Sequence, residues 1–370
     1  MFCGYHAIFL LRIRILGGFL SALKTSFMRF GLNAIGRSGL ANAIKPVFGG
    51  LGAVLMLHHV GNRAPSYFGG NDHLSIKPEF LTQMLDEFRQ ECIDIVSLDE
   101  AIWRMKTDKK TAPFVALTFD DGYRDNIETA YPILQSFRVP FTIFVCSGFV
   151  DRKVPIWWLS LESIIQANNE IELYIDGQTH QLQCVGKSEK GISYEKAVDL
   201  LKNAPFEVAE NCLTRLYDDY QHDPLALVDQ EMSTWDMLSE LTSDPLVTIA
   251  AHTVSHPFLP KLSREKACLE MMDSRNRIKE MTGCETEFFA YPYGFEGAAG
   301  PREVRLAEEM GFKAAFTTRR GTLAAQHANH MCALPRISIN GHFQNMGAMR
   351  ALLSGLPFYI SNRFNRVKTL

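Results

Sequence analysis

The sequence lacks the cysteine pattern of a disulfide framework. Its eight cysteines are scattered along 370 residues, and no two of them form a C-x-x-C pair. Cysteines of this kind are typical of small buried side chains in a reducing compartment. Internal repeats and low-complexity tracts are also missing, so nothing indicates a repeat architecture.

Acidic residues are missing from the start of the chain. No Asp or Glu precedes Asp72, whereas the first 50 positions hold six basic residues among Phe, Leu and Ile: Arg12, Arg14, Lys24, Arg29, Arg37 and Lys45. The first two interrupt the apolar run that a secretory signal or a membrane-spanning helix needs. We expect residues 1–45 to form either an interfacial helix on an anionic membrane or a helix covering the barrel after a few disordered residues. In the second case the chain starts at either Met1 or Met28. We expect a cytoplasmic protein, peripheral at the inner membrane in the first case.

The composition is that of an ordinary globular protein. Hydrophobic residues make up 46% of the chain and charged residues 21%, with a net charge of −3. Nothing in this balance indicates nucleic-acid binding. A chain of this length can bury a large core, and one barrel with an insertion fits it better than two equal domains.

The stretch from Val115 to Tyr123 organises the rest of the interpretation. An apolar run of strand length leads into the adjacent carboxylates Asp120 and Asp121 and ends at Gly122. Such a run predicts a buried strand of a parallel sheet, where chemistry gathers at the carboxyl ends of the strands. A turn beginning at Gly122 would let both carboxylates face one site. The alternative is an acidic turn that caps the next helix.

A second strand-like run, 247–251, ends at His252, and His256 follows four residues later. If the segment turns helical after the strand, both imidazoles lie on one face and can bind one metal. One Asp and two His leave open coordination positions, as in catalytic zinc sites. The same ligands also suit the facial triad of non-haem iron oxygenases, so the metal does not follow from the residues.

These motifs resemble those of the polysaccharide deacetylases of carbohydrate esterase family 4, the NodB-homology domain. The resemblance rests on Thr118–Gly122, His252–His256 and Tyr291–Gly294, and it covers residues 55–339. It implies a distorted (β/α) barrel with fewer than eight strands.

The resemblance also implies roles for individual residues. Asp120 would be the catalytic base, and Asp121, His252 and His256 would bind a divalent metal, usually Zn²⁺. The backbone N–H of Tyr293 would contribute to the oxyanion hole. Substrate contacts are expected from five residues beside the motifs: Tyr123, Trp157, Trp158, Pro292 and Phe295. Adjacent tryptophans such as Trp157 and Trp158 either stack on sugar rings or fill the core.

Two departures from the family pattern concern the catalytic residues. The family usually has an arginine, paired with the base, where this chain has Ala290. Arg336 is our candidate replacement, and its alternative is a surface or interface role. The family's C-terminal general-acid histidine is also missing, but Leu55–His58 has the same shape. This resembles the permuted branch that deacetylates exported poly-N-acetylglucosamine.

By that resemblance His58 is the general acid, because the strand beside the catalytic one in a closed barrel can come from either terminus. His59 would point to the other side of the strand. The alternative for His58 is a hydrogen bond within the barrel.

We therefore predict an α/β protein, a distorted (β/α)7-type barrel with an inserted α+β subdomain. Its parts are a basic-apolar segment (1–50), the deacetylase barrel (51–150 and 230–345), the inserted subdomain (151–229) and a C-terminal helical tail (346–370). The insertion should contain a hairpin around Asp176-Gly177 and a helical stretch over 194–220. In the barrel, helices are expected at 78–91, 98–105, 125–137, 232–241, 263–282 and 301–310.

The predicted function is hydrolytic N-deacetylation of an N-acetylated polysaccharide or oligosaccharide, of the exopolysaccharide or poly-N-acetylglucosamine type. The alternatives are a nodulation-type chitooligosaccharide deacetylase and a catalytically weak carbohydrate-binding barrel. An iron oxygenase is disfavoured, because the alternation of strands and helices does not suit a double-stranded β-helix.

Overall fold

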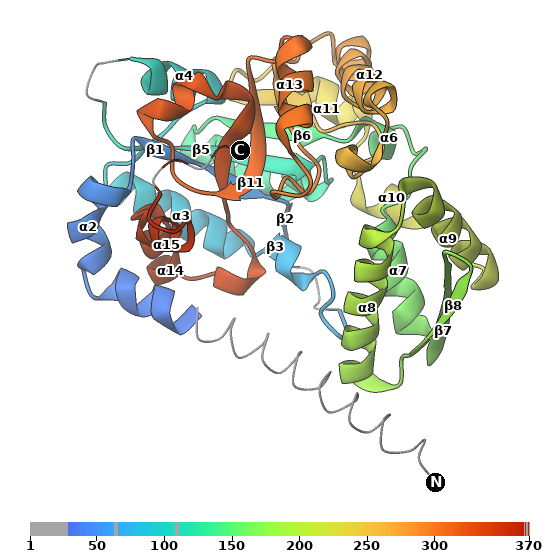
Figure 1. Cartoon of the computed structure of the whole chain (residues 1–370). Coiled ribbons are helices and arrows are strands. Elements are labelled where there is room, and N and C mark those ends of the chain that lie inside the picture. Colours follow the sequence, from blue (N-terminus) through green and yellow to red (C-terminus); the bar gives the residue numbers. More distant parts are fainter. Residues whose placement is uncertain (1–28, 63–65, 108–110, 366, 368, 370) are drawn as a thin grey trace.

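The computed structural model describes residues 29–62, 66–107, 111–365, 367 and 369. Its centre is a closed barrel of seven parallel strands (Figure 1). Around the barrel these are β1 (Gly52–Leu57), β12 (Leu334–Ser338), β11 (Ala314–Arg320), β10 (Phe288–Ala290), β9 (Val247–Ala251), β6 (Phe141–Val145) and β5 (Phe114–Asp121), which pairs with β1. The short strand β4 (Asp94–Ile95) adds to β5. The predicted distorted seven-stranded barrel is confirmed.

Burial of both strand faces explains why the barrel strands read as continuous apolar runs. Every residue of β1 and of β5 is buried, as expected for parallel strands with a filled interior and an outer layer of helices. The pair runs in register from Gly52 opposite Phe114 to Leu57 opposite Phe119. A Cβ at Gly52 would lie 2.5 Å from the carbonyl oxygen of Phe114, so this register requires glycine there.

Helices cover the outside of the barrel: α3 (Pro78–Gln90), α4 (Leu98–Lys106), α5 (Tyr131–Phe137), α11 (Trp235–Leu241), α12 (Arg264–Thr282) and α13 (Pro301–Glu309). The helix predicted over 125–137 is instead a π-helical turn, Asn126–Ala130, followed by α5. The change occurs next to Pro132, which lacks the N–H that a regular α-helix would use there.

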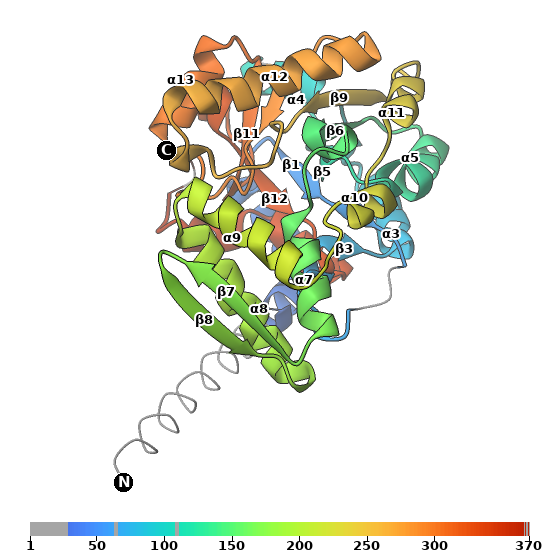
Figure 2. The ribbon, with the colours of Figure 1, turned by 90° about the vertical axis from the view of Figure 1, so that its right-hand side faces the viewer.

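The chain between β6 and β9 forms a group of elements with its own core, drawn in green beside the barrel in Figure 1. It contains α7 (Trp157–Ala167), the antiparallel hairpin β7 (Glu170–Ile175) and β8 (Gln178–Gln183), α8 (Gly186–Asn203), α9 (Phe206–Asp219) and α10 (Ala226–Glu231). Figure 2 shows the hairpin on the outer side of this group. Its apolar cluster includes Leu161, Leu173 and Leu216.

Two local features of this insertion bear on the predictions. Asp176 and Gly177 both have positive φ angles, 51° and 75°, so the predicted tight hairpin turn is confirmed. The helical stretch predicted over 194–220 is confirmed, and it is divided between two helices, α8 and α9. Pro205 disfavours helical backbone at the residue before it, and the helix ends there.

The two ends of the described chain pack together beside the barrel. Helix α2 (Leu40–Phe48) contacts α14 (Met346–Leu353) and α15 (Leu356–Ser361), and residues 29–37 are helical. Most of the basic segment predicted to touch a membrane, residues 1–28, lies outside the described residues, so that prediction stays open. Among the helices of the described chain, none has both the length and the apolar character to cross a membrane.

Candidate active site

A cavity of about 370 Å³ opens at the carboxyl ends of the barrel strands. Asp120 and Asp121 end β5, and the segments after β1, β9 and β10 supply His58, His252 and Tyr293 to its wall. The insertion contributes another part of the wall through α7 and α8. The motifs that are far apart in the sequence therefore meet at the end of the barrel where parallel-strand folds usually place chemistry.

A left-handed turn explains how adjacent aspartates reach one cavity. Asp121 has a φ of 75° and Gly122 a φ of 85°, so the turn begins one residue earlier than the glycine predicts. Asp tolerates this conformation better than most residues do. The turn is anchored by Ser233, whose Oγ donates to the Gly122 carbonyl at 2.8 Å.

The histidine pair lies on a loop and not on a helical turn. Thr253 and His256 have φ angles of 67° and 55°, which an α-helix does not allow. Glu270 of α12 holds this loop: its carboxylate accepts from Val254 N at 2.9 Å and Ser255 N at 2.8 Å. Sequence reasoning missed Glu270, and no local signal marks it, because it lies one helix downstream.

Asp121, His252 and His256 form a buried triad. Their candidate ligand atoms all lie within 4.8 Å of one another, with Asp121 Oδ1 3.3 Å from His252 Nε2 and 3.4 Å from His256 Nε2. His252 donates its Nδ1–H to the Ala290 carbonyl at 2.8 Å, which fixes the tautomer that leaves Nε2 free to bind. Burial lowers the pKa of His256 to about 3, so its ring is neutral.

The triad fits a divalent metal. Asp121 Oδ1 is buried without a hydrogen-bond partner, and an orphaned buried carboxylate oxygen is costly unless a cation or donor compensates it. One carboxylate and two imidazoles are ligands that zinc and iron both accept. The chain thus holds a buried Asp-His-His site suited to a divalent metal of undetermined identity.

Arg336 forms a buried ion pair with Asp120. Its two terminal nitrogens each donate to one Asp120 oxygen at 2.7 Å. Its Nε donates to the Thr317 carbonyl at 3.1 Å, and both members of the pair are buried. Burial alone would raise the pKa of Asp120, but the charge and hydrogen bonds of Arg336 outweigh burial and hold it below its usual range.

The two neighbouring histidines after β1 face different surroundings. His58 is half-buried and lines the cavity, whereas His59 donates its Nδ1–H to Asp125 Oδ2 at 2.8 Å. The His59 ring also packs on Tyr123, with ring centroids 3.6 Å apart. His58 is therefore the member of the pair that a substrate in the cavity can reach. Burial lowers the pKa of His58, opposed by the charges of Asp121 and Asp120.

The aromatic residues at the mouth form one connected layer. Trp157 Nε1 donates to the Tyr293 hydroxyl at 3.1 Å, and the Tyr293 ring stacks on Phe258 at 4.0 Å. Trp157 and Trp158 both line the cavity, but Trp158 is nearly covered and packs against His256. Trp157 is thus more accessible from the cavity than Trp158.

Three predicted substrate contacts do not line the cavity. Tyr123 is fully buried against His59, and so it cannot contact substrate. Pro292 and Phe295 lie outside the wall, and Phe295 is 46% exposed. Sequence reasoning missed several polar residues that do line it: Asn71, His73, Tyr194, Lys202, Arg320, Ser338 and Asn340. These come from separate loops and from the insertion, so no motif joins them.

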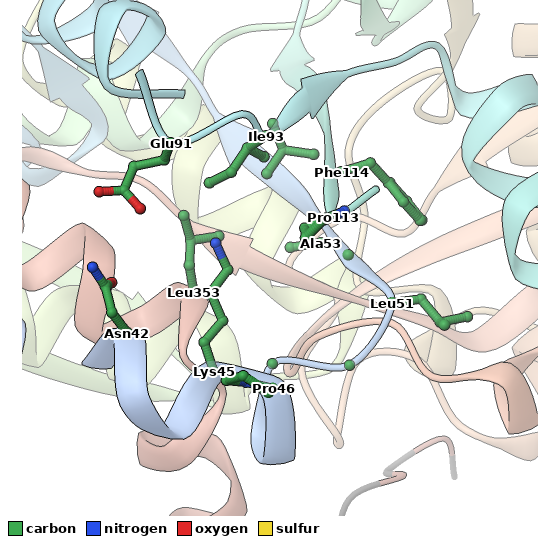
Figure 3. A pocket seen from close by; sticks show the side chains of 14 residues that line it. Asn42, Lys45, Pro46, Leu51, Ala53, Glu91, Ile93, Pro113, Phe114 and Leu353 are labelled. Carbon is green, nitrogen blue, oxygen red and sulfur yellow. The ribbon is translucent and has the colours of Figure 1, made fainter. Parts of the chain in front are cut away.

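A second cavity, of about 330 Å³, lies at the amino ends of the strands (Figure 3). It is lined by α2, the starts of β1 and β5, and Leu353 of α14. Its charged residues are Lys45 and Glu91, and it contains no histidine, cysteine or aspartate. Among the described residues, the Asp121 triad is the one group suited to a metal.

The barrel and the triad together define a class, parallel α/β barrels with a buried Asp-His-His site suited to a divalent metal. The polysaccharide deacetylase family profile matches residues 107–182 and 189–315, more than half of the chain. This protein belongs to the polysaccharide deacetylase family. Both His58 and Arg336 lie outside the matched residues.

Individual relatives are distant. The Bacillus subtilis protein YxkH, assigned by name to the polysaccharide deacetylases, is 22% identical over 242 residues, which span 65% of this chain and 57% of YxkH. The deacetylase PplD of Streptococcus pyogenes shares the fold with a TM-score of 0.54 and 19% identity, over 82% of this chain and 96% of PplD. IcaB from Ammonifex degensii has a TM-score of 0.53 and 19% identity to this chain, over 82% of this chain and 98% of IcaB.

Proposed function

We propose that this protein hydrolyses the N-acetyl group of an N-acetylated polysaccharide or oligosaccharide, of the exopolysaccharide or poly-N-acetylglucosamine type, and releases acetate. The observation that carries the proposal is the convergence of three groups on one cavity: the Asp121 triad, the Arg336-bound carboxylate of Asp120, and His58. Amide hydrolysis needs a base, a place for the oxyanion and a proton for the leaving amine.

Asp121, His252 and His256 would hold the metal, for which family resemblance favours zinc. When bound, a divalent cation there supplies a Lewis acid and lowers the pKa of a water ligand. Asp120 accepts the proton of the attacking water. Arg336 keeps this carboxylate ionised, and two donated hydrogen bonds leave further lone pairs on its oxygens for the proton.

His58 would donate a proton to the departing sugar amine. The strand that carries it, β1, comes first among the barrel strands in the sequence yet lies between β12 and β5. That position supports the proposal that this chain follows the permuted branch, with the acid moved from the last strand to the first. His59 is a poor alternative, because Asp125 and Tyr123 already engage its ring.

Two further groups would contact the substrate, the backbone N–H of Tyr293 and the ring of Trp157. The Tyr293 N–H has no acceptor among the described residues, and the backbone there is left-handed, with a φ of 61°. This supports the role of that N–H in the oxyanion hole. The face of Trp157 would stack on a sugar ring.

Acetate release from N-acetylglucosamine oligomers by the zinc-loaded full chain tests the proposal. We expect release by the wild type and its loss in Asp120→Asn, which keeps the shape of the side chain and removes the base. The variant should keep its metal content and its thermal midpoint. Equal rates for the wild type and this variant, with metal present in both, would overturn the proposal.

A further inference from the structure

We propose that the substrate carries an anionic group, a carboxylate or a phosphate, close to the N-acetyl sugar, and that Lys202 and Arg320 bind this group at the cavity mouth. The inference rests on the proposed deacetylase function and names the substrate class of the same cavity.

The charges of the cavity wall are unbalanced. Its acidic residues are Asp120 and Asp121. Arg336 neutralises the first, and the second belongs to the triad. Lys202 and Arg320 therefore add positive charge that no acidic residue of the wall offsets.

Lys202 reaches the cavity from α8 of the insertion. Its side chain is half-buried, and its Nζ lies 5.4 Å from the centroid of the Tyr293 ring. Among the described residues no carboxylate forms a salt bridge with it, and Asp199 acts on it only electrostatically. A partly desolvated ammonium beside the catalytic tyrosine gains more from an anionic ligand than a fully exposed lysine would.

Arg320 approaches the cavity from the end of β11, on the barrel. Its guanidinium has no ion pair among the described residues and is exposed. Ser338 and Asn340, at the end of the neighbouring strand β12, add a hydroxyl and an amide to the same wall. A guanidinium with nearby neutral donors suits the flat geometry of a carboxylate or the oxygens of a phosphate.

This charge pattern discriminates among N-acetylated sugars. Each deacetylation produces an amine that is cationic at neutral pH, and a positive mouth repels a chain that already carries many such amines. A neutral homopolymer of N-acetylglucosamine offers no group for Lys202 and Arg320. An acidic N-acetyl sugar offers one.

The test compares kcat/KM for acetate release from three probes: a neutral N-acetylglucosamine trimer, N-acetylglucosamine 1-phosphate, and an oligomer containing an N-acetylhexosaminuronic acid. We expect at least one anionic probe to exceed the neutral trimer about tenfold at low salt, as for a charge-assisted hydrogen bond. The preferred probe tells a phosphate source from a carboxylate source. The ratio should fall about tenfold in Lys202→Gln/Arg320→Gln and persist in Lys187→Gln, which removes an exposed lysine from the same helix.

Deacetylation of all three probes with no anionic preference, or a preference unchanged in the double variant, overturns this inference and leaves the proposed function standing. If no probe releases acetate, the proposed function fails and calorimetric binding decides the inference. The anionic sugars should then bind the wild type about tenfold more tightly than the double variant, and equal affinities overturn it.

Discussion

The two ends of this barrel contain cavities of similar size and different chemistry. The cavity at the carboxyl ends, about 370 Å³, holds the triad, Asp120 and His58. The cavity at the amino ends, about 330 Å³, has walls of glycine, proline and apolar side chains, with Lys45 and Glu91 at its edge. Volume therefore does not identify the site, whereas strand direction does.

Strand direction matters because every barrel strand is parallel, so the residues that follow the strands converge at one end. Five segments reach the carboxyl end carrying His58, Asp121, His252, Tyr293 and Arg320. At the other end the chain enters the strands through short, mainly apolar connections such as 49–53 and 113–115.

The largest effect is expected from removing the metal ligands. The double substitution His252→Ala/His256→Ala should abolish metal binding and lower kcat/KM by more than the ~10²–10⁴-fold typical of a single acid or base. Elemental analysis and acetate release measure the two effects. Full metal content in this variant would refute the assignment of the triad.

Arg336→Met should destabilise the fold and shift the pH profile. It leaves the buried Asp120 carboxylate without its partner, at a cost of about 3–5 kcal/mol in the free energy of unfolding. Arg336 depresses the pKa of Asp120 in the native state. The stability from this pair is therefore fully present above the pKa that Asp120 has in the unfolded chain, and it is lost as the pH falls through the pKa of Asp120 in the folded protein. Without Arg336 burial raises that pKa, so the acidic limb of kcat/KM should move to higher pH.

The matched control for that variant is Arg336→Met/Asp120→Asn, which removes the unpaired charge as well. It should recover part of the lost stability in urea denaturation. An acidic limb that stays in place in Arg336→Met would show that Asp120 is not the group that titrates.

His58→Ala should lower kcat on an amide substrate by roughly 10²-fold. The loss should be much smaller on an acetyl ester with a phenolate leaving group, which departs without a proton. The comparison variant is His59→Ala, which should instead cost about 1–3 kcal/mol of stability by leaving Asp125 Oδ2 without its donor. Equal losses on both substrates for His58→Ala would remove it as the general acid.

The amino end offers a binding test, because α2, which lines its cavity, belongs to the basic segment of residues 1–50. Deleting residues 1–28 should reduce co-sedimentation with anionic vesicles. The expected loss in binding free energy is about 1 kcal/mol for each basic residue near the membrane surface. Salt should weaken the binding of the full chain. Unchanged sedimentation after the deletion would rule out membrane contact through residues 1–28.

The smallest effect is expected for Lys45→Met in the far cavity. Burial lowers the pKa of Lys45, so replacing this charge should change stability by at most about 1 kcal/mol and leave kcat/KM unaltered. A loss of activity as large as that of His58→Ala would mean that the two ends are coupled.

Much of this arrangement can be predicted from local pattern. Strand β9 lies at the predicted residues 247–251, because buried parallel strands leave short apolar runs in the sequence. Three further features are visible in short stretches of sequence: the aspartate pair, the histidine pair and the Asp176-Gly177 turn. Each depends on residues that are only a few positions apart.

Tertiary structure decided the rest. Arg336 and Asp120 are 216 positions apart in the sequence. They meet because closure of the barrel places their strands, β12 and β5, on the two sides of β1. The loop around His256 takes its left-handed backbone with support from Glu270, a helix away. Tyr123 does not line the cavity, because its ring packs on His59. Local sequence fixes which residues can form strands and which carry chemistry, but pairings across the barrel depend on closure, which no short stretch encodes.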